Sequence, residues 1–264
     1  MNIHPTAVVD PKAELDSSVV VGPYAVIEAG VCIDEGTTVE PHAVISGPTT
    51  IGKRNLISSF AKVGGAPQDL SYKGEPTELI VGDDNQIREY ASIHRGTPQG
   101  PGKTIIGNSN LLMAYTHIAH DCKLGNNIIL ANVATLAGHV EVGDRASIGG
   151  LVAIHQFCRI GSFSYIGGVS GISLDVAPFV IIAGTRNRTR ISGLNKIGLK
   201  RNGFSKETIS KLDTAFRIIF RSPDLLLKDA LEQAKMEITD CDEVAQLIEF
   251  FESSKRGVVR RTEN

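Results

Sequence analysis

The chain has 264 residues and a formal net charge of −2, which gives no reason to expect nucleic acid or an acidic membrane surface as a partner. Hydrophobic residues make up 42% of the chain, but only 5% are aromatic and none is tryptophan, which suits a thin solenoid lined by aliphatic side chains better than a bulky globular core. The four cysteines lie far apart, without a C-x-x-C pair, so a zinc ribbon is not expected and reduced thiols are.

The first residues carry no targeting signal. Met1–Pro5 has neither a basic stretch nor an apolar run, so we expect no secretory signal. No apolar segment approaches the length that spans a bilayer. We therefore expect a cytoplasmic protein.

An aliphatic residue recurs at every sixth position from the start of the chain. A period of six fits neither a helix nor an alternating strand as the primary repeat. It is typical of a hexapeptide solenoid, a parallel β-helix in which three short faces form one triangular coil of about 18 residues. The first run comprises Ile3, Val9, Leu15, Val21, Ile27, Ile33, Val39, Ile45, Ile51, Ile57 and Val63.

Two segments interrupt the repeat. Residues 64–76 contain two prolines and three glycines, which predicts an excursion out of the coil. Residues 96–102 are also rich in glycine and proline, and they shift the frame by one position. The longest uninterrupted run follows: Ile106, Leu112, Ile118, Leu124, Leu130, Leu136, Val142, Ile148, Ile154, Ile160, Ile166 and Ile172.

The composition changes after the repeat fades near Asp175. We expect residues 1–185 to form the β-helix domain and residues 186–264 to form a basic loop followed by a small helical domain. Ser205 predicts the N-cap of a first helix, with Glu207 in its first turn. Apolar residues spaced three and four apart predict two further helices, one starting at Pro223 and one containing Val244 and Phe251.

The basic loop, residues 186–201, contains six basic residues and no acidic one. Such runs are most often solvated surface. The alternative is a docking surface for an acidic partner protein and for phosphate groups. The basic residues are Arg186, Arg188, Arg190, Lys196, Lys200 and Arg201.

Four of the seven histidines lie in the most regular part of the repeat. They are His117, His120, His139 and His155. Because residues 18 apart are neighbours in adjacent coils, Gly138 should lie beside His120. Acyl transfer needs such a pair, a base for the attacking hydroxyl and an N–H donor for the developing oxyanion. The alternatives are structural histidines at the edge of a solenoid, or a zinc site formed by histidines of neighbouring coils.

Several longer motifs together resemble the UDP-N-acetylglucosamine O-acyltransferase family over essentially the whole chain. The motifs are His94-Arg95-Gly96-Thr97, His117-Ile118-Ala119-His120-Asp121-Cys122, Leu136-Ala137-Gly138-His139, Ala153-Ile154-His155-Gln156-Phe157-Cys158, the segment from Gln68 to Thr77, and the segment from Gly198 to Ser205. The resemblance implies a left-handed parallel β-helix followed by a small C-terminal helical domain. It also implies a homotrimer with active sites between subunits.

The reaction implied by the resemblance is acyl transfer in the first step of lipid A synthesis. An (R)-3-hydroxyacyl group, roughly of myristoyl length, would move from acyl carrier protein to the 3-hydroxyl of UDP-N-acetylglucosamine. No metal or other cofactor is implied, because pantetheine arrives on the carrier protein.

The resemblance also implies roles for individual residues. His120 would be the general base, Asp121 its partner and the Gly138 N–H the oxyanion donor. Gly168 falls where the family sets acyl length, and its lack of a side chain leaves room for a longer chain. The remaining binding residues would be His117, His139, His155 and Gln156 at the acceptor and pantetheine sites, Asp69 at the glucosamine hydroxyls, and Asn195 and Arg201 on the nucleotide-sugar side.

Three positions depart from the family pattern. Ser71 stands where close relatives have Lys, Ile197 where some have Glu, and Asn202 where many have a second Arg. They leave open an acceptor with a 3-amino group.

Three other functions are possible on the same fold. The first is N-acylation of a glucosamine nitrogen, whose separate N-terminal recognition domain we do not expect here because the repeat begins at Ile3. The others are a zinc hydratase and a non-catalytic solenoid.

Overall fold

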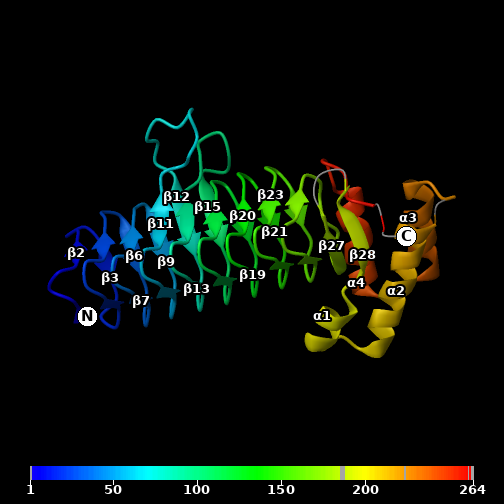
Figure 1. The fold of residues 1–264 in the computed structure, drawn as a ribbon, viewed down its shortest axis with the longest axis horizontal. Coiled ribbons are helices and arrows are strands. Elements are labelled where there is room, and N and C mark those ends of the chain that lie inside the picture. Colours follow the sequence, from blue (N-terminus) through cyan, green and yellow to red (C-terminus); the bar gives the residue numbers. More distant parts are fainter. Residues whose placement is uncertain (1, 185–187, 223, 261, 263–264) are drawn as a thin grey trace.

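The computed structural model describes residues 2–184, 188–222, 224–260 and 262. It is an elongated stack of triangular coils with a group of helices at its C-terminal end (Figure 1). Each coil contributes one short strand to each of three parallel sheets, called A, B and C here in the order the chain visits them. The predicted parallel β-helix is therefore present.

The three sheets run along the stack, and the strands in each are three apart in the chain until the last turn. Sheet A contains β1 (Asn2–Ile3), β4 (Val20–Val21), β7 (Thr38–Val39), β10 (Leu56–Ile57), β13 (Gln86–Ile87), β16 (Leu111–Leu112), β19 (Ile129–Leu130), β22 (Ser147–Ile148), β25 (Tyr165–Ile166), β27 (Val180–Ala183) and β28 (Arg190–Leu194). Sheet B contains β2 (Val8–Val9), β5 (Val26–Ile27), β8 (Val44–Ile45), β11 (Lys62–Gly65), β14 (Ser92–His94), β17 (His117–Ile118), β20 (Thr135–Leu136), β23 (Ala153–Ile154) and β26 (Gly171–Ile172). Sheet C contains β3 (Glu14–Leu15), β6 (Val31–Ile33), β9 (Thr49–Ile51), β12 (Glu78–Val81), β15 (Lys103–Ile106), β18 (Lys123–Leu124), β21 (Glu141–Val142) and β24 (Arg159–Ile160).

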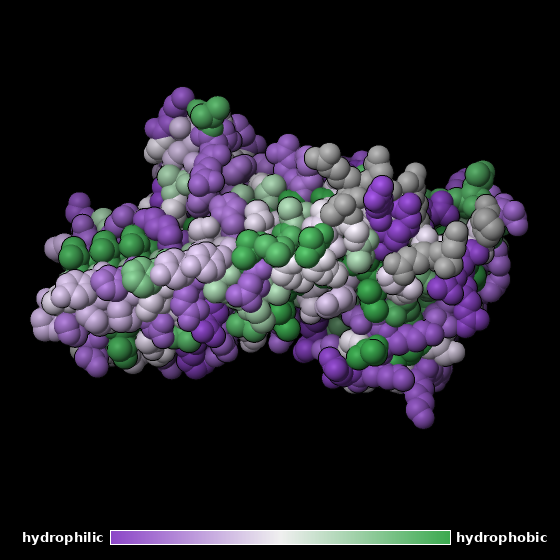
Figure 2. Space-filling view, viewed as in Figure 1, coloured by the Kyte–Doolittle hydropathy of each residue, from purple (hydrophilic) through white to green (hydrophobic). Residues whose placement is uncertain are grey.

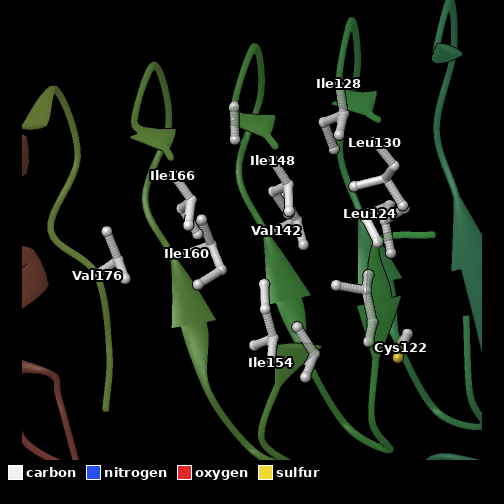
Figure 3. Close-up of a cluster of buried hydrophobic side chains, with 14 of the residues drawn as sticks. Cys122, Leu124, Ile128, Leu130, Val142, Ile148, Ile154, Ile160, Ile166 and Val176 are labelled. Atoms are coloured by element: carbon white, nitrogen blue, oxygen red, sulfur yellow. The ribbon is translucent and has the colours of Figure 1, made fainter. Parts of the chain in front are cut away.

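The six-residue repeat forms the core. From Val21 onward the repeat residues named above are at most 3% exposed, and Figure 3 shows those from Leu124 to Ile166 stacked in rows along the interior. The first coil differs, because Ile3 is 37% exposed and Val9 and Leu15 are only partly buried. That coil has a neighbour on one side only, so its side chains lack half of their packing partners.

Three corners separate the sheets, and they are called the A–B, B–C and C–A corners here. The second residue of a corner adopts a left-handed conformation, as at Asp121 with φ of 60° and His139 with φ of 61°. Exposed corners such as Tyr24, with φ of 58°, do the same. This conformation costs an L-residue energy, and it belongs to the coil rather than to any special site.

A ladder of buried asparagines holds successive coils in register at the C–A corner. The side-chain oxygen of Asn55 accepts from the backbone N–H of Asn85 at 2.9 Å, that of Asn85 accepts from Asn110, and that of Asn110 accepts from Ile128 at 2.8 Å. All three asparagines are at most 1% exposed. Each bond therefore satisfies a buried backbone donor that would otherwise cost energy.

Both predicted excursions leave the stack at the B–C corner. One spans residues 66–77 between β11 and β12, and the other spans residues 95–102 between β14 and β15. They project side by side from the same edge of the molecule (Figure 1). Arg95 ties them together, because its guanidinium donates to the carbonyl of Gly64 at 2.7 Å and to the hydroxyl of Tyr72 at 3.2 Å.

The described residues of the C-terminal part form four helices, α1 (Lys196–Arg201), α2 (Lys206–Arg221), α3 (Leu227–Glu237) and α4 (Asp242–Glu252). The predicted N-cap of α2 is confirmed, because the Ser205 hydroxyl accepts from the N–H of Thr208 at 3.0 Å and Glu207 lies in the first turn. Among the described residues, no helix combines the length and apolar content that crossing a membrane requires.

Two expectations for this part were wrong. The segment 186–201 is not a loop throughout, because β28 pairs antiparallel with β27 and α1 follows it. Ile191 and Leu194 are buried there, and the many basic residues around them hid the apolar residues that indicate a strand. The helix predicted to start at Pro223 is α3, which begins at Leu227 after an N-cap at Leu226. Pro223, Arg186 and the predicted boundary between residues 185 and 186 lie outside the described residues.

Candidate active site

The B–C corner stacks chemically active side chains into two columns. Strand register places β17, β20 and β23 side by side, with His117 opposite Thr135 and Thr135 opposite Ala153. The corner residues that follow are therefore also aligned. The first column contains His120, Gly138 and Gln156, and the second contains Asp121, His139 and Phe157.

His120 and Asp121 form a hydrogen-bonded pair within one chain. The His120 Nδ1 and Asp121 Oδ2 atoms lie 2.8 Å apart, and the side chains are 17% and 0% exposed. Because an ionised carboxylate only accepts hydrogen bonds, this contact places the proton on Nδ1. The Nε2 atom is then left as the basic nitrogen, which is the arrangement a general base needs.

Asp121 sits in a seat built by the second excursion. Its Oδ2 accepts from the Thr97 hydroxyl at 2.6 Å, and its two oxygens accept from the Thr97 N–H at 3.0 and 3.1 Å. A Cβ on Gly100 would lie 2.5 Å from the Asp121 carboxyl carbon, so the loop covers the carboxylate closely. These donors fix the orientation of the Asp121 carboxylate toward His120.

Gly138 lies directly against the His120 ring, as the spacing of 18 predicts. A Cβ at this position would meet Cε1 at 2.6 Å and Nε2 at 2.8 Å. Only glycine therefore permits the ring to occupy this place. The Gly138 N–H donates no hydrogen bond to another described residue, so it is free to donate to a ligand.

His139 borders the same space from the next coil. Its ring packs edge-on to His120, with centroids 5.2 Å apart, and stacks on Phe157 at 4.4 Å. Its Nε2 lies 3.7 Å from Asp121 Oδ2. Burial lowers the pKa of His139 despite the opposing effect of the Asp121 carboxylate, so the ring is available as a neutral hydrogen-bonding group.

Two further histidines lie behind His120 on sheet B. The His117 Nδ1 is 2.7 Å from the Ser92 hydroxyl, and the His117 ring packs edge-on to His94, with centroids 4.9 Å apart. Burial and the nearby His120 lower the pKa of His117. Burial, with the neighbouring imidazoles and Arg95, lowers the pKa of His94 to about 4. His94 is 6% exposed, and its Nδ1 has no hydrogen-bond partner among the described residues.

Asp69 faces this site from the first excursion. Its carboxylate accepts from the N–H and the hydroxyl of Ser71, both at 2.8 Å. These bonds, with smaller contributions from the charges of His120 and His139, lower the pKa of Asp69. Ser71, one of the departures from the family pattern, thus holds the Asp69 carboxylate in place.

Three of the remaining predicted residues, Gly168, Asn195 and Arg201, lie away from His120. Gly168 lies at the A–B corner, on the far side of sheet B from His120. Asn195 caps α1, because its side-chain oxygen accepts from the Gly198 N–H at 3.0 Å and its amide donates to the Phe163 carbonyl at 2.9 Å, at the C–A corner. Arg201 ends α1 and is exposed. His155 and Gln156 are exposed one coil beyond His139.

The predicted site residues also form the one metal-capable group among the described residues. His120, Asp121 and His139 place one ligand atom each within 4.8 Å of one another. However, both Asp121 oxygens already accept hydrogen bonds from Thr97, and Oδ2 also accepts from His120. A zinc ion would have to replace these bonds, so the geometry favours an acid–base pair.

Two residues that contact the site were not predicted from the sequence. Thr97 was noted only as part of a motif, and its partner Asp121 is 24 positions away across a loop of unknown path. Arg256, whose guanidinium lies 2.9 Å from His155 Nδ1, is 101 positions from its partner. The only signal that could have indicated Thr97 is that a buried carboxylate such as that of Asp121 needs hydrogen-bond donors.

Comparisons with known proteins identify the family that this chain resembles. Residues 175–259 match a family model described as "Udp N-acetylglucosamine O-acyltransferase; Domain 2". The chain is 54% identical to the acyl-[acyl-carrier-protein]--UDP-N-acetylglucosamine O-acyltransferase of Janthinobacterium sp. (strain Marseille) and 52% identical to that of Burkholderia orbicola (strain MC0-3). Both matches cover 98% of this chain and 99% of the relative.

Solved structures give the same result. The structure of LpxA from Acinetobacter baumannii matches with a TM-score of 0.94 at 47% identity, covering 98% of this chain and 99% of that one. UDP-N-acetylglucosamine O-acyltransferase from Moraxella catarrhalis matches with a TM-score of 0.95 at 45% identity, covering 98% and 100%. These neighbours confirm the predicted left-handed parallel β-helix with C-terminal helices.

The depressed pKa of His94 predicts loss of stability in acid. The unfolded chain takes up a proton on this residue near pH 6.5, whereas the folded chain does so only near pH 4. Stability is therefore retained above pH 6.5 and falls as the pH drops, by about 2–3 kcal/mol between pH 7.5 and 4.5. Urea unfolding at both pH values should show that His94→Gln loses less unfolding free energy between pH 7.5 and 4.5 than wild type does, by this amount. The exposed His4→Gln variant is the control, and equal losses in His94→Gln and wild type would contradict the prediction.

Proposed function

Because the chain belongs to the UDP-N-acetylglucosamine O-acyltransferase family, we propose that it transfers an (R)-3-hydroxyacyl group from acyl carrier protein to the 3-hydroxyl of UDP-N-acetylglucosamine. This is the first step of lipid A synthesis. The observation that carries the chemical part of the proposal is the His120–Asp121 pair lying against Gly138. We further propose that the reaction takes place in the cytoplasm, without a metal or other cofactor.

The proposed reaction uses His120 as the base. Nε2 takes the proton of the sugar 3-hydroxyl while that oxygen attacks the thioester carbonyl of the acyl donor. The Gly138 N–H donates to the oxyanion that forms. When the carbon–sulfur bond breaks, His120 returns its proton to the pantetheine sulfur, and the acyl group remains on the sugar oxygen.

His120 and the residues around it should each contribute to the rate enhancement. A positioned general base contributes about 10²–10⁴-fold, and one oxyanion donor contributes about 2.7–4 kcal/mol. Asp121, held by Thr97, keeps the proton on Nδ1 and stabilises the imidazolium that forms. Asp69 and His139 border the same space and are placed to accept hydrogen bonds from, or donate them to, the sugar hydroxyls.

We propose that the complete site needs a second chain. The proposed binding residues lie at three different corners of one coil stack, with His120 at the B–C corner, Gly168 at the A–B corner and Asn195 beside the C–A corner. A single ligand cannot contact three corners of one solid coil. Neighbouring chains of a threefold ring, which is a permitted closed symmetry, can bring different corners together.

An exposed apolar ridge on the A–B corner supports this assembly. The rings of Tyr24, His42, Phe60, Tyr90 and Tyr115 stack in one line with centroids 4.8–5.2 Å apart. Val133, Leu151 and Val169 continue the line and are 39–66% exposed. Figure 2 shows separate groups of exposed apolar residues on the stack, and a row of exposed apolar side chains such as this ridge indicates an interaction surface.

The acyl group is proposed to be of about myristoyl length. Gly168 is exposed, and a Cβ at this position would meet only the backbone of Gly150, with the oxygen at 3.2 Å and the nitrogen at 3.8 Å. The corner is thus open where the family sets acyl length.

The reaction is tested first by removing the base. Wild-type protein should transfer the acyl group from labelled 3-hydroxymyristoyl carrier protein to UDP-N-acetylglucosamine, with unchanged rate after chelation. His120→Ala should fold normally and lose at least about 10³-fold in kcat/KM. If folded, metal-free wild-type protein gives no product with UDP-N-acetylglucosamine but gives product with a 3-amino sugar, the acceptor is the amino sugar. If it gives no product with either sugar, acyl transfer is refuted.

Acyl length is tested at Gly168. Gly168→Met should shift the preferred donor from 3-hydroxymyristoyl to a chain shorter by several carbons, because its side chain fills the open end of the groove. Competition between 10-, 12- and 14-carbon donors would measure the shift. The same substitution at the equivalent corner position one coil earlier, Gly150→Met, is the matched control. An unchanged preference in Gly168→Met would contradict the assignment.

Sharing of the site between chains is tested by mixing two defective variants. If His120 and Arg201 act from different chains, mixed trimers of His120→Ala and Arg201→Ala contain intact sites and regain activity. Each variant alone should be at least about 10²-fold slower than wild type. Mixed trimers verified by mass spectrometry that show no recovery would rule out a shared site, as would an Arg201→Ala enzyme with wild-type kinetics.

A further inference from the structure

The C-terminal tail returns from the helices and docks onto the last coil. Asp175, which is 1% exposed, holds it in place. Its carboxylate accepts from the Ser254 hydroxyl and the Arg159 N–H, both at 2.8 Å. Its backbone N–H donates to the Gly257 carbonyl, and its carbonyl accepts from the Val259 N–H, both at 2.9 Å. Arg256 lies between Ser254 and Gly257, so the Ser254 side chain before it and the Gly257 backbone after it fix its position.

Arg256 reaches from this tail to the candidate active site. Its Nε donates to the Ser173 carbonyl at 2.8 Å, and its Nη2 lies 2.9 Å from Nδ1 of His155. Ser173 occupies the same corner position as His155, one coil later. The planar guanidinium thus bridges two coils at the end of the columns that begin with His120 and Asp121.

This contact determines which nitrogen of His155 carries the proton. A guanidinium has only N–H donors and stays protonated, so Nδ1 must accept the hydrogen bond. The Gln156 carbonyl lies 3.2 Å from the same Nδ1 and would favour a proton there. The shorter contact is to a donor that cannot accept, so the carbonyl contact is the one that gives way.

The consequence is a donor aimed away from the protein. With Nδ1 as the acceptor, the neutral ring carries its proton on Nε2, and this atom has no partner among the described residues. His155 is the residue before Gln156, which belongs to the first corner column. It lies one coil beyond His139. Its Nε2–H is therefore a free hydrogen-bond donor at the edge of the site.

We propose that Arg256 is a positioning residue that holds His155 in the Nε2–H form and directs this donor at a substrate. The tail of the helical domain thereby completes the site on the β-helix. The functional part of this proposal rests on the acyl transfer proposed above. The arrangement of the two side chains does not.

The arrangement is tested without substrate by nitrogen NMR of ¹⁵N-histidine-labelled protein at pH 8, with His155→Gln to assign the signal. Neutral imidazole in water exchanges between its two tautomers, whereas His155 should show an unprotonated Nδ1 and a protonated Nε2 only. In Arg256→Ala the two shifts should move toward tautomer-averaged values. A proton on Nδ1, or shifts that Arg256→Ala leaves unchanged, would overturn the proposal even if the enzyme acts on other substrates.

The functional role is tested by a double-mutant cycle. Arg256→Ala should raise, by about tenfold, the KM for the same substrate whose KM His155→Ala raises, with kcat changed less than twofold. In the His155→Ala background it should have no further effect. Arg256→Lys should not restore the KM, because its single nitrogen cannot occupy the separate positions of Nε and Nη2.

Arg260→Ala is the matched control, since this tail arginine donates to the Ile219 carbonyl of α2 at 3.2 Å and does not contact His155. It should leave the KM values unchanged. If Arg256→Ala raises KM equally with and without His155, the residue only anchors the tail and the proposal is wrong.

Discussion

The structure depends on the requirement that one aliphatic side chain in every six fill a narrow triangular interior. Burial of these side chains is the main favourable term, and it fixes the length of an uninterrupted coil at 18 residues. Because each coil has the same length, corner residues of successive coils are superposed. The columns that bring His120 to Gly138 and His139 to Phe157 are direct results of this packing rule.

The candidate active site lies where excursions interrupt the regular 18-residue coils. The two excursions leave the stack at the corner that carries His120, and they supply what a regular corner cannot. The second excursion covers the Asp121 carboxylate with Thr97 donors, and the first brings Asp69 to the same space. A regular coil would have left Asp121 as one more exposed corner residue in a left-handed conformation, without a fixed partner.

The parts of this structure that could be predicted are those that follow from spacing. The position of Gly138 beside His120 needed only a count of 18 residues, and the N-cap at Ser205 needed only local sequence. The contact of Thr97 with Asp121 crosses an irregular loop, and the contact of Arg256 with His155 crosses the whole helical domain, so no period relates either pair. Strand β28 was missed because it lies in the segment 186–201, whose six basic residues outnumber Ile191 and Leu194, and tertiary packing on sheet A overrode the local composition.

The regular coils between the N-terminus and the excursions contain no proposed site residue, and this has a consequence for how the chain can change in length. Inserting or deleting 18 residues there would shift the end of the molecule by one strand spacing, about 4.8 Å, and leave every later corner facing the same way. Inserting or deleting six would rotate everything beyond by one face of the triangle. Length variation in this part of the chain should therefore come in multiples of 18 residues, that is, in whole coils.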